Sequence, residues 1–179
     1  EKECILVLPR LYPQAALAEA NIGDAARNPI LRVSWSIPLR RSQGGPGSPG
    51  NRCLTLSSTA ACIASCSMGP GKSMTILNAS GKPFGAISAQ ESGLGFTITT
   101  RPGSEVILGL DEDGELGAVD KDNQVLAFTE AIPGNSAHRR LCIGPGVDVG
   151  LMTLAFLAID LYEHMPPELQ PPMGSADCL

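Results

Sequence analysis

The strongest constraint on the fold is an uncharged apolar segment near the end of the chain. Residues 149–159 (VGLMTLAFLAI) contain no charged residue, and only Gly150 signals a turn. Asp148 precedes the segment, where its carboxylate can accept hydrogen bonds from the first helical amides. Pro166 and Pro167 stop a helix on the other side. The pattern therefore predicts a helix over residues 148–165, about 25 Å long at about 1.5 Å per residue.

The predicted helix is apolar on every side, and a helix of this kind is buried all round. The run is shorter than the roughly 18–20 residues that a membrane-spanning helix needs. A β-sheet that closes around the helix would give it a dry interior and would remove the open edges of the sheet. The residues expected to build this central helix are Asp148 as its cap and Leu151, Leu154, Phe156, Leu157 and Ile159 in the core.

The residues before the helix provide strands for such a sheet. From Ser73 onward, short runs rich in Ile, Val, Phe and Thr alternate with turn clusters at roughly ten-residue spacing, which is typical of an antiparallel meander. Each turn contains Gly or Asn, which tolerate positive φ. The expected strands are residues 74–77, 84–89, 96–100, 106–110, 116–119 and 125–129.

The first seventy residues are less regular. Strands are expected at residues 4–8, 30–39, 53–56 and 62–66, and the Ala-rich segment 15–26 predicts a short helix after Pro13. Residues 42–51 are rich in Gly, Pro and Ser, which predicts a flexible loop inserted between strands. The Pro-rich residues 166–179 predict a loose tail. We therefore expect one domain over residues 1–165.

The charge is unevenly distributed along a chain whose net charge is −5. Residues 91–130 contain nine acidic residues against Arg101 and Lys121, whereas residues 1–60 carry an excess of basic residues. The acidic residues lie at expected turn positions, where they keep the turns soluble. A negative net charge weighs against broad non-specific binding of nucleic acid, so no nucleic-acid partner is expected.

The end of the chain carries a family resemblance. Residues 140–148 (RLCIGPGVD) lead into the apolar run 154–159, which is followed by Asp160. Residues 81–87, 96–99 and 106–110 look like repeating strand pairs. This arrangement resembles the tubby C-terminal-like superfamily, which includes the tubby domain, the phospholipid scramblases and the LURP-one-related proteins. The resemblance covers about residues 72–165, and residues 1–71 would supply the first half of the barrel.

The resemblance implies a mainly β fold, a closed antiparallel barrel of about twelve strands around the buried C-terminal helix. It also brings two functional precedents, the binding of phosphoinositide headgroups and scramblase-type activity at a membrane. Neither carries over residue by residue. The tubby headgroup site needs a cluster of Lys and Arg on adjacent strands, whereas residues 73–130 contain only Lys82, Arg101 and Lys121.

Two basic pairs are the candidate contacts for anionic lipid headgroups or other anions. Arg40 and Arg41 stand beside the expected flexible loop, and Arg139 and Arg140 follow His138. The alternative for both pairs is a solvated position beside a strand.

Motifs for bound nucleotides or calcium are incomplete. Residues 69–73 (GPGKS) resemble the end of a phosphate-binding loop, but Cys66 stands where the first Gly is needed. Residues 111–115 (DEDGE) resemble the start of a calcium loop, but Leu116 and Asp122 replace the required Gly and Glu. A solvated hairpin turn is favoured over a weak calcium site.

The six cysteines include one close pair, Cys62 and Cys66, and no second close pair that would complete a zinc site. Buried free thiols are expected, and a metal or redox role is the alternative. Neither His138 nor His164 lies near a nucleophile motif, and no Gly-x-Ser-x-Gly sequence occurs. The sequence therefore favours a protein that is not an enzyme and has no cofactor.

These observations favour a non-catalytic interaction or scaffold module, an accessory subunit docked on the protein subunits of a larger membrane complex. The bias toward Ala, Gly and Pro suits a GC-rich algal or protist gene, which suggests an organellar setting in a plastid or mitochondrion and a photosynthetic complex. The alternative is a peripheral phospholipid-binding or scramblase-like protein that contacts anionic headgroups. A transmembrane segment of its own is not expected.

Overall fold

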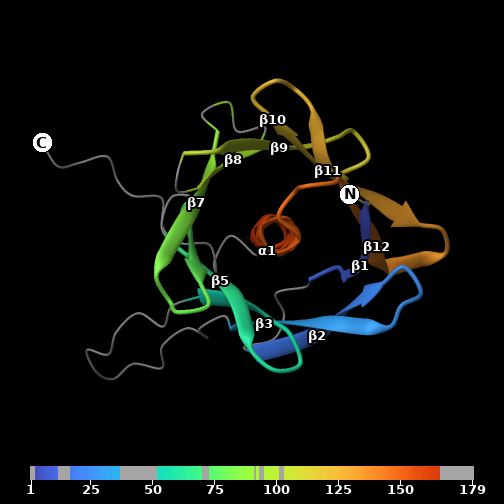
Figure 1. Ribbon diagram of the computed structural model, residues 1–179. Coiled ribbons are helices and arrows are strands. Elements are labelled where there is room, and N and C mark those ends of the chain that lie inside the picture. Colours follow the sequence, from blue (N-terminus) through green and yellow to red (C-terminus); the bar gives the residue numbers. More distant parts are fainter. Residues whose placement is uncertain are drawn as a thin grey trace, which may run out of the picture.

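The computed structural model describes residues 3–11, 17–36, 52–69, 73–90, 92, 95–100 and 103–165. Twelve strands in these residues form one closed antiparallel barrel, as the sequence predicts (Figure 1). Strands adjacent in sequence pair with each other, and β1 closes the circle against β12. The strands are β1 (Cys4–Pro9), β2 (Leu17–Asp24), β3 (Pro29–Ser36), β4 (Arg52–Ser57), β5 (Cys62–Met68), β6 (Ser73–Asn78), β7 (Pro83–Ala89), β8 (Gly95–Thr100), β9 (Glu105–Leu110), β10 (Leu116–Asp120), β11 (Val125–Ile132) and β12 (Asn135–Ile143).

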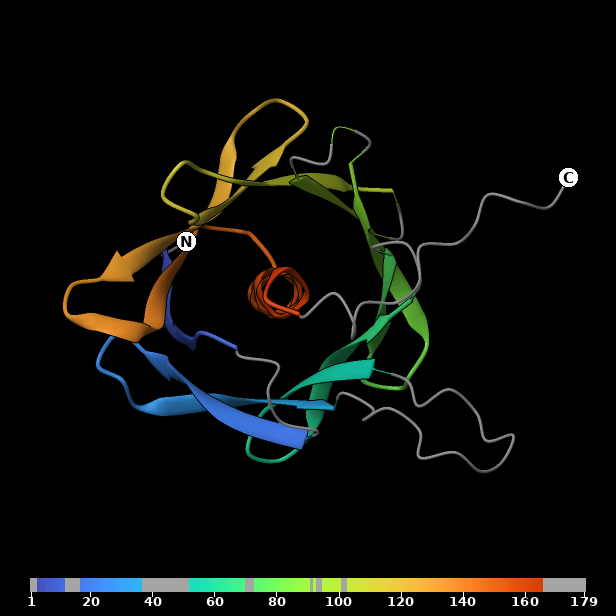
Figure 2. The same cartoon turned by 180° about the vertical axis from the view of Figure 1, so that it is seen from behind.

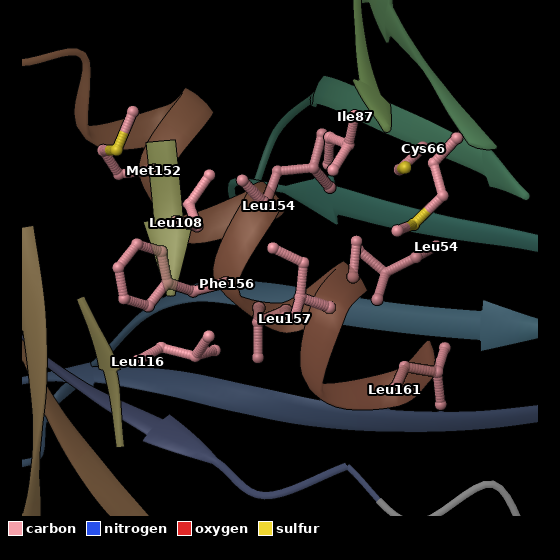
Figure 3. Packing of buried hydrophobic residues seen from close by; sticks show 14 of the residues in the cluster. Leu54, Cys66, Ile87, Leu108, Leu116, Met152, Leu154, Phe156, Leu157 and Leu161 are labelled. Carbon is pink, nitrogen blue, oxygen red and sulfur yellow. The ribbon is translucent and has the colours of Figure 1, made fainter. Parts of the chain in front are cut away.

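The helix α1 (Val149–Glu163) runs through the middle of the barrel, with strands around it in both views (Figures 1 and 2). Eleven consecutive residues, Met152 to Tyr162, are buried, so every face of this stretch is covered. Figure 3 shows Leu154 close to Ile87 and Cys66, while Phe156 points toward Leu108 on the other side. Each fully buried side chain of this kind contributes about 1.5–3 kcal/mol relative to exposure.

The predicted core positions of the helix are confirmed, with one exception. Leu154, Phe156, Leu157 and Ile159 are fully buried. Leu151 is only half-buried, because it lies in the first turn, where the helix enters the barrel.

The ends of the helix follow from local chemistry. Asp148 is the N-cap, as predicted, and its Oδ1 accepts a hydrogen bond from the Leu151 amide at 2.9 Å. The preceding turn requires Gly146, whose φ of +79° favours glycine. The predicted boundaries of 148–165 are slightly too wide, because the last helical residue is Glu163 and His164 caps the helix.

Strand formation follows the period of two expected for a sheet with one buried face. In β8, Phe96 and Ile98 are buried in the barrel, whereas Thr97 and Thr99 alternate with them and face outward. The same alternation runs through most of the barrel, and its inward residues form one continuous core with α1.

The turns are built by Asp and Asn side chains that accept hydrogen bonds from their own turn. The Oδ1 atom of Asp111 accepts from the amides of Asp113 and Glu115 at 3.0 and 2.8 Å. Asp24, Asn78 and Asp120 make the same pair of contacts two and four residues onward. This confirms that the acidic residues at these positions shape hairpin turns.

Two sequence predictions fail in this fold. The helix predicted over residues 15–26 is wrong, because residues 17–24 form the strand β2, in which Ile22 faces the core and Glu19 and Asn21 face solvent. The strand β12 was not expected, because its residues 138–140 look like a basic surface patch. The predicted loop 42–51 and tail 166–179 lie outside the described residues.

Candidate binding surface

The outer face of β4 to β8 carries no charged side chain among the residues whose side chains are described. Its positions alternate with the inward residues Leu54, Cys66, Ile76, Ile87 and Ile98, all of which are buried. We call this surface the neutral wall. It consists of Cys53, Thr55, Ser57, Ile63, Ser65, Ser67, Ser73, Thr75, Leu77, Ala86, Ser88, Thr97 and Thr99, which are half-buried or exposed.

The strand register aligns these small residues in rows across the barrel. In one row each residue is the Cα partner of the next, and the row ends at Glu105 on β9. Its members, from β3 to β8, are Ser36, Cys53, Ser67, Thr75, Ala86 and Thr99. None of these side chains is long, so a partner could approach the backbone of the sheet closely.

The neutral wall has the size of an interface core. Neighbouring strands lie about 4.8 Å apart and each residue rises about 3.3 Å, so five strands of about six residues cover roughly 400–500 Å². A standard interface takes about 800 Å² from one partner and has an uncharged core inside a polar rim. Arg32 on β3 and Glu105 on β9 flank the wall on its two sides, where such a rim would lie.

The rest of the barrel, which we call the charged half, consists of β9 to β12 and β1 to β3. On its outer face Arg140 of β12 pairs with Glu130 of β11 at 3.2 Å, and Arg32 pairs with Glu19 at 3.3 Å. All four side chains are about half exposed, so each pair contributes little to stability. Phe128 is the exposed aromatic residue on this side.

The charged half also places charge inside the barrel, near the C-terminal end of α1. The Arg139 guanidinium lies 3.0 Å from Asp160 Oδ1, and both side chains are almost completely buried. The other Asp160 oxygen accepts a hydrogen bond from the Leu11 amide at 3.0 Å. Burial lowers the pKa of Arg139, and the charge of Asp160 opposes that shift. The pair therefore joins the helix to β12 through the core.

A second ion pair extends this internal cluster. Arg10 donates to Glu115 Oε1 at 2.7 Å, and the Thr129 hydroxyl donates to Glu115 Oε2 at 2.6 Å. The amide of Leu116 donates in turn to the Thr129 hydroxyl at 2.8 Å. These contacts compensate the burial of the Glu115 carboxylate, so the cluster has a structural role in holding β10, β11 and residue 10 together.

The predicted anion contacts are not brought together on one surface. The prediction for Arg139 is wrong, because its side chain is 1% exposed and its partner is Asp160. Arg140 is exposed but already pairs with Glu130. Arg40 and Arg41 lie outside the described residues, so their role as lipid or anion contacts stays a prediction.

The cysteines occupy different environments. All five in the described residues are free, as expected, but only Cys66 and Cys142 are buried, whereas Cys62 is exposed. Burial is the main cause that raises the pKa of Cys66 to about 12 and also raises the pKa of Cys142. Within the described part of the chain, no three His, Cys, Asp or Glu side chains gather in a group that could hold a metal ion.

The neutral wall was missed in the sequence, although a signal for it exists. Residues 53–100 contain only Lys72, Lys82 and Glu91 as charged residues, and all three lie between strands. The apolar residues locate the strands, whereas the wall is formed by the residues that alternate with them. Counting charge at every second residue of each strand would have revealed the wall.

No family model, curated protein or solved structure matches the chain. Among the described residues, no helix combines the length and the apolar character needed to cross a membrane.

Proposed function

We propose that this chain is a non-catalytic docking module, an accessory subunit that binds a protein neighbour through the neutral wall. The observation that carries the proposal is the lack of charge at the described outward positions of five adjacent strands, between Arg32 on one side and Glu105 on the other. Sheets that face water on one side normally alternate apolar and polar residues. Here the outward polar residues are Ser and Thr, and no outward residue whose side chain is described carries a charge.

An uncharged surface suits an interface because it costs less free energy to remove from water than a charged one. A charged side chain loses hydration when a partner covers it, and this cost is recovered only by a well-placed opposite charge. Ser and Thr hydroxyls lose less, because each can rotate to donate or accept a hydrogen bond. Short side chains such as Ser67 and Thr75 also lose little conformational freedom on binding.

The setting we propose is a larger membrane complex in a plastid or mitochondrion, which the composition of the chain suggests. The resemblance to the tubby-like superfamily supports this use of the barrel as a module and equally supports lipid binding. A lipid surface is the weaker alternative, because Arg139 is buried against Asp160 and Arg140 is paired with Glu130.

The test is blue-native electrophoresis of gently solubilised membranes that contain the tagged chain or its variants. The double substitution Thr75→Lys/Thr99→Lys puts two charges on exposed positions of the wall. The matched control Asn21→Lys/Ser136→Lys puts two charges on exposed positions of the charged half. We expect the native chain and the control to migrate with a high-mass band and the wall variant to migrate alone, near 19 kDa.

Two outcomes would contradict the proposal. Migration of the native chain near its own mass of 18.6 kDa would remove the accessory subunit. Co-migration of the wall variant with the complex would place the interface elsewhere. Binding of the purified chain to anionic liposomes, weakened by salt, would favour the lipid alternative.

A further inference from the structure

A cavity of about 190 Å³ opens beside the first turn of α1, at the opposite end of the helix from the internal ion pairs. It lies between the helix and strands β5 to β7. Its apolar lining includes Ile63, Ala64, Ile76, Phe84, Leu151 and Leu154.

The cavity exists because two small residues face each other across it. Ala64 is the inward residue of β5 that precedes Cys66, and it fills less space than the leucines at equivalent positions of β4. On the helix, Gly150 lacks a side chain, and a Cβ atom there would come within 3.5 Å of Ile63 Cγ2. The helix therefore begins with less side-chain volume than its next turns carry.

The polar oxygens at the mouth are already engaged. Asp148 Oδ1 accepts from the Leu151 amide at 2.9 Å. Asn78 Oδ1 accepts from the amides of Ser80 and Lys82 at 3.1 and 3.0 Å. A ligand that depends on these oxygens would compete with the helix cap and the turn. The carboxylate of Asp148 also opposes any negatively charged ligand.

We propose that this cavity is a binding site for a small, uncharged apolar molecule, about the size of benzene or a short hydrocarbon chain. An enclosed apolar cavity of about 150 Å³ is large enough to bind benzene, and the cavity here has a comparable volume but is open to solvent on one side. Ile63 and Leu77 belong both to the cavity lining and to the neutral wall. The test below uses the isolated chain without a protein partner, so its result does not depend on the proposed function.

The test uses benzene as the probe and methyl NMR of the folded chain as the readout. We expect the methyl signals of Ile63, Ile76, Leu151 and Leu154 to shift in a saturable way on addition of benzene. The methyl signals of Leu141, on β12 near the ion pairs, should stay in place. Benzoate, which has the same ring and a negative charge, should bind at least ten-fold more weakly than benzene.

Two variants test the location of the site. Ala64→Leu fills the cavity and should weaken benzene binding at least ten-fold, whereas the control Ala86→Leu, on the neutral wall, should leave it unchanged. If Ala64→Leu does not fold, Leu151→Phe narrows the mouth and serves the same purpose. Absence of saturable shifts in the native chain, or undiminished binding in the folded cavity variant, would overturn the proposal.

Discussion

The strands that carry the neutral wall, β4 to β8, and the strands of the charged half present the same apolar pattern to the inside of the barrel but different side chains to the outside. Both provide alternating apolar residues for the core around α1. On the outer face, the charged half carries ion pairs such as Arg140 with Glu130, whereas the neutral wall carries mostly Ser and Thr together with Ala, Cys, Ile and Leu. The inward positions provide most of the apolar burial in both regions, so the two regions differ chiefly in what their outer faces present to solvent.

The two sides also differ in how they hold the helix. Near β4 and β5 the helix packs against the buried residues Leu54, Leu56 and Cys66, which belong to the same apolar core. On the side of β12 it is held by the buried pair of Arg139 and Asp160. The helix is therefore held on the side of β12 by a buried ion pair and on the side of β4 and β5 by core packing.

The largest effect is expected from a charge in the shared core. Leu154→Asp or Phe156→Asp places an unpaired carboxylate at a fully buried position, and its desolvation exceeds the roughly 5–15 kcal/mol that stabilises a typical domain. Both substitutions should abolish the cooperative thermal transition in circular dichroism. A folded Asp variant would mean that the helix does not lie in the core shared by the two sides of the barrel.

The next effect concerns the ion pair that belongs only to the charged half. Arg139→Met leaves Asp160 buried without its partner and should lower the free energy of unfolding by about 3–5 kcal/mol. The double variant Arg139→Met/Asp160→Leu should recover part of that loss, because neither charge of this pair is left buried, while the Leu11 amide loses its acceptor. Urea unfolding of the single and double variants measures both values. A single variant as stable as the native chain would show that the pair does not hold the helix.

A smaller contrast lies within β5, between an exposed thiol at the start of the strand and a buried thiol further along the same face. Cys62 is exposed, whereas the pKa of Cys66 is raised to about 12 by burial. At pH 8 the Cys66 thiolate should be at least a thousandfold scarcer than that of a thiol with the ordinary pKa of about 8.5. Pulsed alkylation with mass spectrometry should modify Cys62 first. Equal rates would mean that the barrel does not shield Cys66 from solvent.

The raised pKa of Cys66 also predicts how the free energy of unfolding depends on pH. The folded state keeps the Cys66 proton to a higher pH than the unfolded state does, so this group favours folding less as pH rises above the unfolded pKa of about 8.5. Stability should therefore decline from pH 8 to pH 11, and Cys66→Ala should flatten that decline. A decline of the same slope in Cys66→Ala would assign it to other groups.

The smallest effect is expected on the outer face of the charged half. Arg140→Ala removes a pair that is about half exposed, and the loss in the free energy of unfolding should stay below about 1 kcal/mol. Raising the salt concentration should reduce that loss further. A loss above about 2 kcal/mol would mean that charge on this face stabilises the fold, which would weaken the contrast with the neutral wall.

The fold was largely predictable, because the apolar helix and the short strands carry strong local patterns. The Asp148 cap and the buried Leu154, Phe156, Leu157 and Ile159 follow from one sequence segment. The strand β2 was mistaken for a helix because alanine suits both, and its register is set by pairing with β3. The role of Arg139 could not be predicted, since its partner Asp160 lies 21 positions away in the sequence.

The most direct measurement is hydroxyl-radical footprinting of the chain, free and in its native complex, with the protection of each peptide compared. The account predicts protection of outward residues on β4 to β8, such as Ile63 and Leu77, and unchanged reactivity of Phe128 on β11. Protection centred on Phe128, or an identical pattern in both samples, would contradict the claim that the neutral wall is the docking face.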